Sequence, residues 1–149
     1  MVDASALPEV FGKVIEAKQL LETEGFTCVL CLGTQIVTSH RRGVAPLLEL
    51  LDSGTDVRNY SAADKVVGKA TAMLYRLLGV RRVYGAVMSD AAIQTLEDGN
   101  IDVRFGKKVS YIVNRAGDGR CPMETATANI DDPPEALTAI KAKLKELQG

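Results

Sequence analysis

The sequence has no tryptophan, one histidine and three cysteines, and aromatic residues make up only 5% of its 149 positions. So few, irregularly spaced cysteines exclude a disulfide framework and fit a reducing compartment. No apolar run approaches the roughly 18 residues that a membrane span needs. The first ten residues also lack the basic and apolar regions of a secretory signal. We therefore expect a cytoplasmic protein that does not engage a membrane.

A surplus of positive charge is also absent, because 18 Lys and Arg face 19 Asp and Glu. Nucleic-acid-binding domains usually show a basic surplus, so we expect no nucleic-acid partner. A hydrophobic share of 46% and a charged share of 25% are typical of a globular protein. The length suits one domain, which we place over residues 1–149.

Hydrophobic periodicity predicts an alternation of helices and strands. The expected helices cover residues 7–24, 44–51, 61–78, 89–97 and 133–147, and the expected strands cover 26–32, 35–39, 82–88, 101–105 and 109–113. The third helix is assigned because Ser61-Ala62-Ala63-Asp64 has the pattern of a capping box. A first hairpin followed by strand–helix–strand crossovers predicts a three-layer α-β-α sandwich.

Cys28 and Cys31 form a C-x-x-C pattern within an expected strand. Residues three apart on a strand point to opposite faces, so these thiols cannot share a metal ion or a disulfide. The only histidine is His40. We therefore expect both cysteines to act as small core residues and no metal or other cofactor to be bound.

Lys65, Lys69 and Arg76 fall in one sector of the helix expected from Ser61, and the first two lie near its N-terminus. A helix N-terminus favours anions, so this stripe predicts an anion site. A solvated basic stripe is the equally weighted alternative. Gly68 costs stability within a helix, which indicates close approach of backbone or ligand at that position.

The stretch "NRAGDGRCPMET", residues 114–125, places Cys121 directly before a helix start, with Pro122 at the first helical position and Glu124 three residues after the cysteine. Cysteine is a poor N-cap. A helix N-terminus and nearby arginines would lower the pKa of its thiol and raise its nucleophilicity. The alternative is that Cys121 only begins a helix, since no general base accompanies it in sequence.

Five segments together resemble an uncharacterised domain-of-unknown-function family. They are "TSHRRGVAPLLELL" (38–51), "DKVVGKA" (64–70), "GKKVSYIVNR" (106–115), "CPMET" (121–125) and "DDPPEAL" (131–137). The resemblance covers nearly the whole chain and implies a cytidine-deaminase-like fold with a mixed sheet between helices. Zinc deaminases carry His or Cys ligands and a glutamate at two helix starts. The helix starts expected here, at Ser61–Lys65 and Met88–Ala91, lack them, so we expect no zinc-dependent deamination.

Ligands of such sheets bind where the parallel strands end and helix N-termini converge. We therefore expect one crevice with Cys121, Asp64 and Lys69 as candidate catalytic residues. The candidate ligand-binding residues are Lys65, Ser39, Gly43, Ser89, Asn114, Arg115 and Glu124. Three functions stay open: an enzyme acting on a small anionic or nucleotide-like ligand through Cys121, a non-catalytic module that binds such a ligand, and a structural protein that pairs as a homodimer.

Overall fold

The computed structural model describes residues 9–148, which contain one five-stranded mixed sheet of order β2-β1-β3-β4-β5. The strands are β1 (Cys28–Leu32), β2 (Gln35–Ser39), β3 (Ser61–Val67), β4 (Arg82–Ser89) and β5 (Asp102–Val109). β1 is antiparallel to both β2 and β3, whereas β3, β4 and β5 run parallel. The expectation of a mixed sheet is confirmed.

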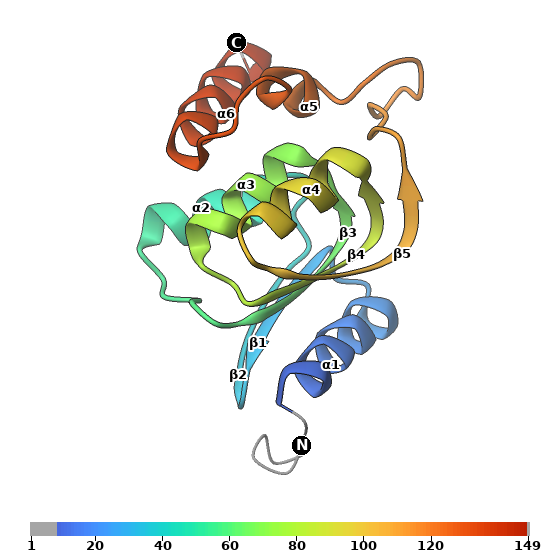
Figure 1. Cartoon of the computed structure of the whole chain (residues 1–149), viewed down its shortest axis with the longest axis vertical. Helices are drawn as coiled ribbons and strands as arrows, with labels where there is room; N and C mark the ends of the chain where they lie inside the picture. The colour runs from blue at the N-terminus through green and yellow to red at the C-terminus, as the bar shows by residue number, and fades with distance from the viewer. Residues whose placement is uncertain (1–8, 149) are drawn as a thin grey trace.

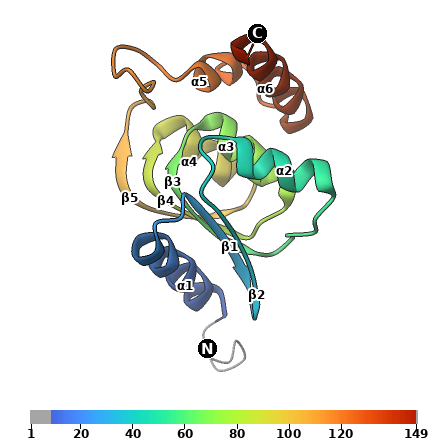
Figure 2. The same ribbon diagram turned by 180° about the vertical axis from the view of Figure 1, so that it is seen from behind.

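Helices cover both faces of this sheet (Figure 1). They are α1 (Glu9–Glu24), α2 (Ala45–Ser53), α3 (Lys69–Leu78), α4 (Asp90–Asp98), α5 (Pro122–Thr127) and α6 (Pro133–Gln148). α1 lies on one face, and α2, α3 and α4 lie on the other (Figures 1 and 2). α5 and α6 pack on the outer side of α3. The three-layer arrangement is therefore confirmed, with the C-terminal helices added over α3.

The hairpin forms as expected, because Gly33 adopts the left-handed conformation (φ 61°) that a two-residue turn between β1 and β2 requires. Cys28 and Cys31 are buried in two different hydrophobic clusters on opposite sides of β1. The prediction that these cysteines are separate core residues is therefore confirmed.

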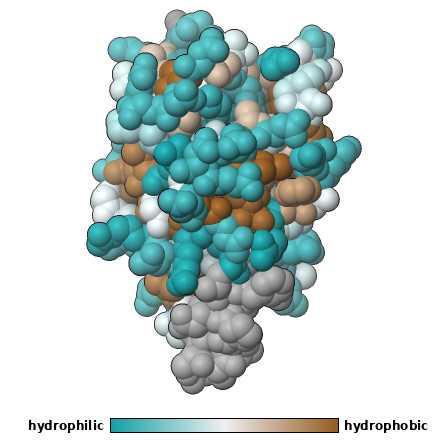
Figure 3. All heavy atoms as spheres, in the orientation of Figure 1, coloured by the Kyte–Doolittle hydropathy of each residue, from teal (hydrophilic) through white to brown (hydrophobic). Residues whose placement is uncertain are grey.

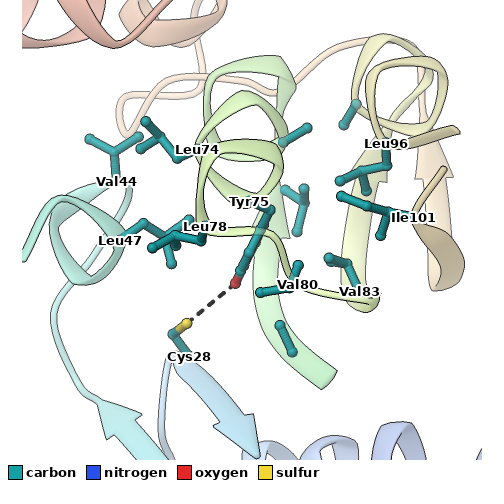
Figure 4. Close-up of a cluster of buried hydrophobic side chains, with 14 of the residues drawn as sticks. Cys28, Val44, Leu47, Leu74, Tyr75, Leu78, Val80, Val83, Leu96 and Ile101 are labelled. Carbon is teal, nitrogen blue, oxygen red and sulfur yellow. Dashed lines mark hydrogen bonds between the residues drawn. The ribbon is translucent and has the colours of Figure 1, made fainter. Parts of the chain in front are cut away.

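The larger cluster lies between the sheet and the layer of α2, α3 and α4, with Ile140 of α6 joining it. Figure 4 shows Leu74, Tyr75 and Leu78 of α3 at its centre, between α2 and the end of α4. The smaller cluster lies under α1 and includes Ala17, Leu21 and Tyr84. Most of the surface visible in Figure 3 is hydrophilic, and the apolar residues on it form separate patches.

The helix expected from Ser61 is wrong in its first part. Residues 61–67 form β3, which pairs with β1 on one side and β4 on the other. The capping-box pattern is local, whereas the burial of Ser61 to Asp64 in mid-sheet is set by these two neighbouring strands. α3 instead begins at Lys69 after Gly68, which supplies no side-chain cap.

The other boundaries agree more closely with expectation. Ser89 caps α4 by accepting a 3.1 Å hydrogen bond from the Ala92 N–H, and Asp132 accepts one from Glu135 at the start of α6. The separate strand expected over 109–113 is wrong, because β5 ends at Val109 and only an isolated bridge joins Val113 to Arg120. The expected start of the first helix, at residues 7 and 8, lies outside the described residues. From Glu9 to Gln148, no helix combines the length and apolarity required to cross a membrane.

Candidate functional site

Lys69 is the first residue of α3, and it is buried at the contact between this helix and the C-terminal segment. Its Nζ donates a 3.0 Å hydrogen bond to the Ala128 carbonyl and lies 3.7 Å from Oδ1 of Asp131. Its backbone N–H donates to Oε1 of Glu124 at 3.3 Å. The charge of Lys69 therefore serves to hold the segment after α5 against α3.

Glu124 fills the position at the N-terminus of α3 where an anion was expected. Its side chain is 8% exposed, and a Cβ placed at Gly68 would lie only 2.5 Å from its Oε1. A group does lie close to Gly68, but the prediction is wrong in its detail: Gly68 precedes α3, and the approaching group is the Glu124 side chain and neither backbone nor ligand. A carboxylate at a helix N-terminus is stabilised by the helix dipole, so Glu124 acts as a cap supplied from another helix.

Lys65 does not share a helix with Lys69, because it lies on β3 and is exposed. Arg76 lies on α3 beneath Gly99, where a Cβ would meet the Arg76 Nε at 2.7 Å. The basic stripe expected on one helix is therefore wrong. Lys65 is exposed on β3, Lys69 contacts the segment after α5, and Arg76 lies against Gly99 after α4.

Asp64 is a buried residue of β3 and not a helix cap. It accepts a 2.8 Å hydrogen bond from the Tyr75 hydroxyl of α3. Burial raises the pKa of Asp64 from 3.8 to about 7, while the hydrogen bonds from Tyr75 and from the backbone of Val66 and Lys65 act in the opposite direction. Near neutral pH this carboxyl is therefore close to its titration point.

Cys28 extends this contact into a chain of three buried groups, since its Sγ lies 3.3 Å from the Tyr75 hydroxyl (Figure 4). Burial, with a further contribution from Asp64, raises the pKa of the Cys28 thiol well above its ordinary value. Burial likewise raises the pKa of Tyr75. The Cys28 thiol and the Tyr75 hydroxyl therefore stay protonated near neutral pH, and with Asp64 they form one hydrogen-bonded chain. No sequence pattern indicated Tyr75 as a partner of Asp64.

Cys121 is half-buried and stands at the N-cap of the six-residue α5, where its side chain makes no capping hydrogen bond. Its backbone N–H donates to the Ile112 carbonyl at 2.9 Å. Ile112 in turn lies against Gly68, with Cγ1 3.1 Å from a Cβ at that glycine. Cys121 is therefore near the start of α3, but no hydrogen bond joins its side chain to Lys69 or Asp64 within the described residues.

The remaining candidate residues are dispersed. Ser89 is buried as the cap of α4, and Asn114 closes its own loop through hydrogen bonds with Asp118. Arg115 is exposed in that loop, whereas Gly43 forms the turn before α2 with φ 62°. Most of these residues have structural partners of their own, and Ser89 and Asn114 bond within their own segments. One crevice that gathers all of them stays a prediction.

A pocket of about 270 Å³ lies between the β1–β2 hairpin and α2, and we name it the hairpin pocket. It is lined by Cys28, Leu30, Val37, Thr38, Ser39, Pro46, Glu49, Leu50 and Ser53. Its floor is apolar, and Cys28 connects it to Tyr75 and Asp64. No Lys, Arg or His is among these lining residues, and the lining carboxylate of Glu49 forms an ion pair with Arg41. Of the residues proposed from sequence for ligand binding, Ser39 is the one that reaches this pocket.

Comparison with known families gives one clear match. Residues 16–144 match the domain of unknown function DUF1893. The chain belongs to the DUF1893 family. A solved DUF1893 protein from Thermotoga maritima is 22% identical and has a TM-score of 0.81, with 89% of this chain and 90% of that one covered. A search of curated proteins finds no match to the sequence.

Two deaminases show a weaker likeness to this DUF1893 chain. The dCMP deaminase of cyanophage S-TIM5 is 12% identical with a TM-score of 0.44, covering 69% of this chain and 99% of that one. A diaminohydroxyphosphoribosylaminopyrimidine deaminase/5-amino-6-(5-phosphoribosylamino)uracil reductase from Thermotoga maritima is 10% identical with a TM-score of 0.43, covering 78% and 40%.

Of the two helix starts expected in this DUF1893 chain, the one at Ser61 is replaced by the start of α3 at Lys69, and the one at Met88–Ala91 is the start of α4. α2 follows Val44, α3 follows Gly68 and α4 follows Ser89, and the sequence at these points has no His or Cys. Among the side chains of residues 16–148, no group of three or more His, Cys, Asp or Glu is arranged to hold a metal ion.

Proposed function

We propose that this DUF1893 domain is a non-catalytic binding module whose site is the hairpin pocket. The observation that carries the proposal is the pocket itself, which combines an apolar floor of Cys28, Leu30 and Val37 with hydroxyl groups at its rim. Concave, mostly apolar sites with few polar groups are the usual form of binding sites.

The contacts of the residues that the sequence predicts to be catalytic favour a binding module over an enzyme. Lys69 is committed to Ala128, and Asp64 is committed to Tyr75. A nucleophile and its base must lie within hydrogen-bond reach of one another. Cys121 has no such base among the described residues, so an acid–base or nucleophilic reaction lacks its second group.

An anionic ligand is also less favoured than the sequence indicated. At the start of α3 it would have to displace Glu124, and at the hairpin pocket the only charged lining residue is the carboxylate of Glu49. The site therefore suits an uncharged, mainly apolar group that offers hydrogen-bond donors at its edge.

Blocking the pocket tests this function. Ser53 is exposed at the last position of α2, so Ser53→Trp can place an indole over the pocket without opening the core. The wild-type chain, Ser53→Trp and the surface control Ser110→Trp are screened by thermal shift against neutral fragments, nucleosides, nucleotides and short peptides. Stabilisation by any of these in the wild type and in Ser110→Trp, lost in Ser53→Trp, is the expected result. Compounds that stabilise all three proteins alike, or no stabilisation at all, would refute the proposed site.

A further inference from the structure

β2 is an edge strand whose outer side is unpaired within the described residues, because its only partner there is β1. Gln35 faces Leu32 across the two-residue turn, a position that pairs through backbone hydrogen bonds. The Ser39 carbonyl also points to the β1 side, where it accepts a 2.9 Å hydrogen bond from the Thr27 N–H. Backbone groups alternate in direction along a strand, so those of Ile36 and Thr38 point outward.

The hairpin pocket adjoins this open edge. Thr38 is one of the residues that line the pocket. Its cross-strand neighbour Val29 belongs to the cluster on the α1 side of the sheet, which is the side away from α2. The neighbours of Val37 and Ser39, which are Leu30 and Cys28, belong to the cluster on the α2 side. A strand added to β2 would therefore direct every second side chain toward the gap between the hairpin and α2.

The pocket is sized for a single anchor. Its volume of about 270 Å³ lies just below the roughly 300–1,000 Å³ typical of small-molecule sites. Recognition by strand addition uses main-chain hydrogen bonds for affinity and pockets for alternate side chains for specificity. The outward backbone groups of Ile36 and Thr38 can form the main-chain hydrogen bonds, and the neighbouring pocket can take a side chain.

Positive charge follows directly after β2. His40, Arg41 and Arg42 are consecutive and exposed. Arg41 is paired with Glu49, whereas the Arg42 guanidinium has no ionic partner among the side chains of residues 16–148. Arg42 follows Thr38 by four residues, in the segment between the end of β2 at Ser39 and the start of α2. This cation complements an acidic residue three or four positions from the anchoring side chain.

Resting on the proposed binding function, we infer that the occupant of the hairpin pocket is an extended peptide segment of another protein. It pairs with the outer edge of β2, inserts one apolar side chain between the hairpin and α2, and places an Asp or Glu opposite Arg42. A segment without proline at its pairing positions is required, because proline cannot donate to the strand.

A displayed library of random nine-residue peptides, selected on the whole chain, tests this partner. Thr38→Pro removes an outward N–H and leaves the bonds to β1 in place, which suits an edge strand. Ser53→Trp fills the pocket, and Arg42→Glu is compared with Arg115→Glu as its charge control. We expect enriched peptides with one large apolar residue and an acid three or four positions away. Their affinity should fall at least tenfold with Thr38→Pro, Ser53→Trp or Arg42→Glu, and stay within twofold with Arg115→Glu.

A peptide-side control keeps the test independent of any folding defect in a variant. N-methylation of the amides that pair with β2 should weaken binding to the wild-type protein at least tenfold, and methylation of the alternate amides should not. Peptides without the apolar–acidic pattern, or peptides unaffected by these changes, would overturn the inference. If neutral fragments bind the wild type but not Ser53→Trp, and no peptide is selected, the peptide partner alone is overturned. The proposed function then stands. Self-association abolished by Thr38→Pro would show a second copy as the occupant and also overturn it.

Discussion

The Tyr75 hydroxyl donates a 2.8 Å hydrogen bond to Oδ2 of Asp64 inside the core, and both residues are nearly or fully buried. The bond joins the middle of β3 to the middle of α3 across the layer boundary. Without it, Asp64 would be a buried carboxyl facing mainly apolar neighbours. Stability should therefore depend on this pair and on pH.

Replacement of Asp64 by asparagine tests the pH dependence. The folded-state pKa of about 7 lies above the ordinary 3.8, so between these values the folded chain holds a proton that the unfolded chain has released. The stabilisation is full below about pH 4 and is lost as the pH rises through about 7. The difference corresponds to roughly 4 kcal/mol in the free energy of unfolding.

Urea unfolding of the wild type at pH 4 to 8 should show this fall, and Asp64→Asn should flatten it. Asp56→Asn is the control, because the hydrogen bonds of Arg58 lower the pKa of that exposed carboxyl to about 2. Its pH dependence therefore lies below about pH 4, and Asp56→Asn should leave the fall from pH 4 to 8 unchanged. A wild-type stability that rises steadily from pH 4 to 8 would contradict the assignment.

Removal of the Tyr75 hydroxyl tests the same pair from the other side. Tyr75→Phe keeps the ring in the core and leaves Asp64 and Cys28 without their shared partner. A buried polar group left unsatisfied costs about 1–3 kcal/mol, so the free energy of unfolding should drop by that amount at pH 8. Tyr60→Phe, at a half-buried tyrosine, is the matched control and should change stability by less than about 0.5 kcal/mol. Equal effects of the two variants would show that the hydrogen bonds contribute little.

Local sequence patterns were sufficient to predict part of this fold. The Gly33 turn, the Ser89 cap and the start of α6 depend on neighbouring residues, and they were predictable for that reason. The strand at Ser61 was not, because Ser61-Ala62-Ala63-Asp64 satisfies a helix-capping pattern while β1 and β4, distant in sequence, pair with it. Two lysines that would have shared a helix face then fell on different elements.

The site was less predictable than the fold for a related reason. Glu124 reaches Lys69 across 55 positions and Tyr75 meets Asp64 across 11. Single-residue features marked Lys69, Asp64 and Glu124 as unusual, but the spacing carried no information about their partners. The hairpin pocket depends on how far the short α2 covers the twisted hairpin, and no sequence motif predicts this coverage.

Alkylation should distinguish the three cysteines in the native protein. Cys28 and Cys31 are buried, with exposed fractions of 2% and 0%, whereas Cys121 is half-buried. Iodoacetamide at pH 8 should therefore label Cys121, and label the other two only after denaturation, as read by peptide mass spectrometry. Labelling of Cys28 at a rate near that of Cys121 would show that the hairpin opens away from α2 on the experimental timescale.

The approach of Glu124 to Gly68 makes a final, quantitative prediction. A Cβ at Gly68 would lie 2.5 Å from Oε1 and 3.0 Å from Cδ of Glu124, and 3.1 Å from Ile112 Cγ1, so Gly68→Ala must displace α5 or bend these side chains. We expect a loss of about 1–3 kcal/mol in the free energy of unfolding. Gly119→Ala is the control, since its nearest neighbour, Asn114 Nδ2, lies at 3.5 Å.

A double-mutant cycle separates the two partners of that glycine. Residues in direct contact show interaction energies of roughly 0.5–3 kcal/mol. If Glu124 is the group that excludes a side chain at position 68, then Gly68→Ala should cost less in a Glu124→Ala background than in the wild type. Additive losses would assign the strain to Ile112 instead, and would mean that Glu124 caps α3 without restricting residue 68.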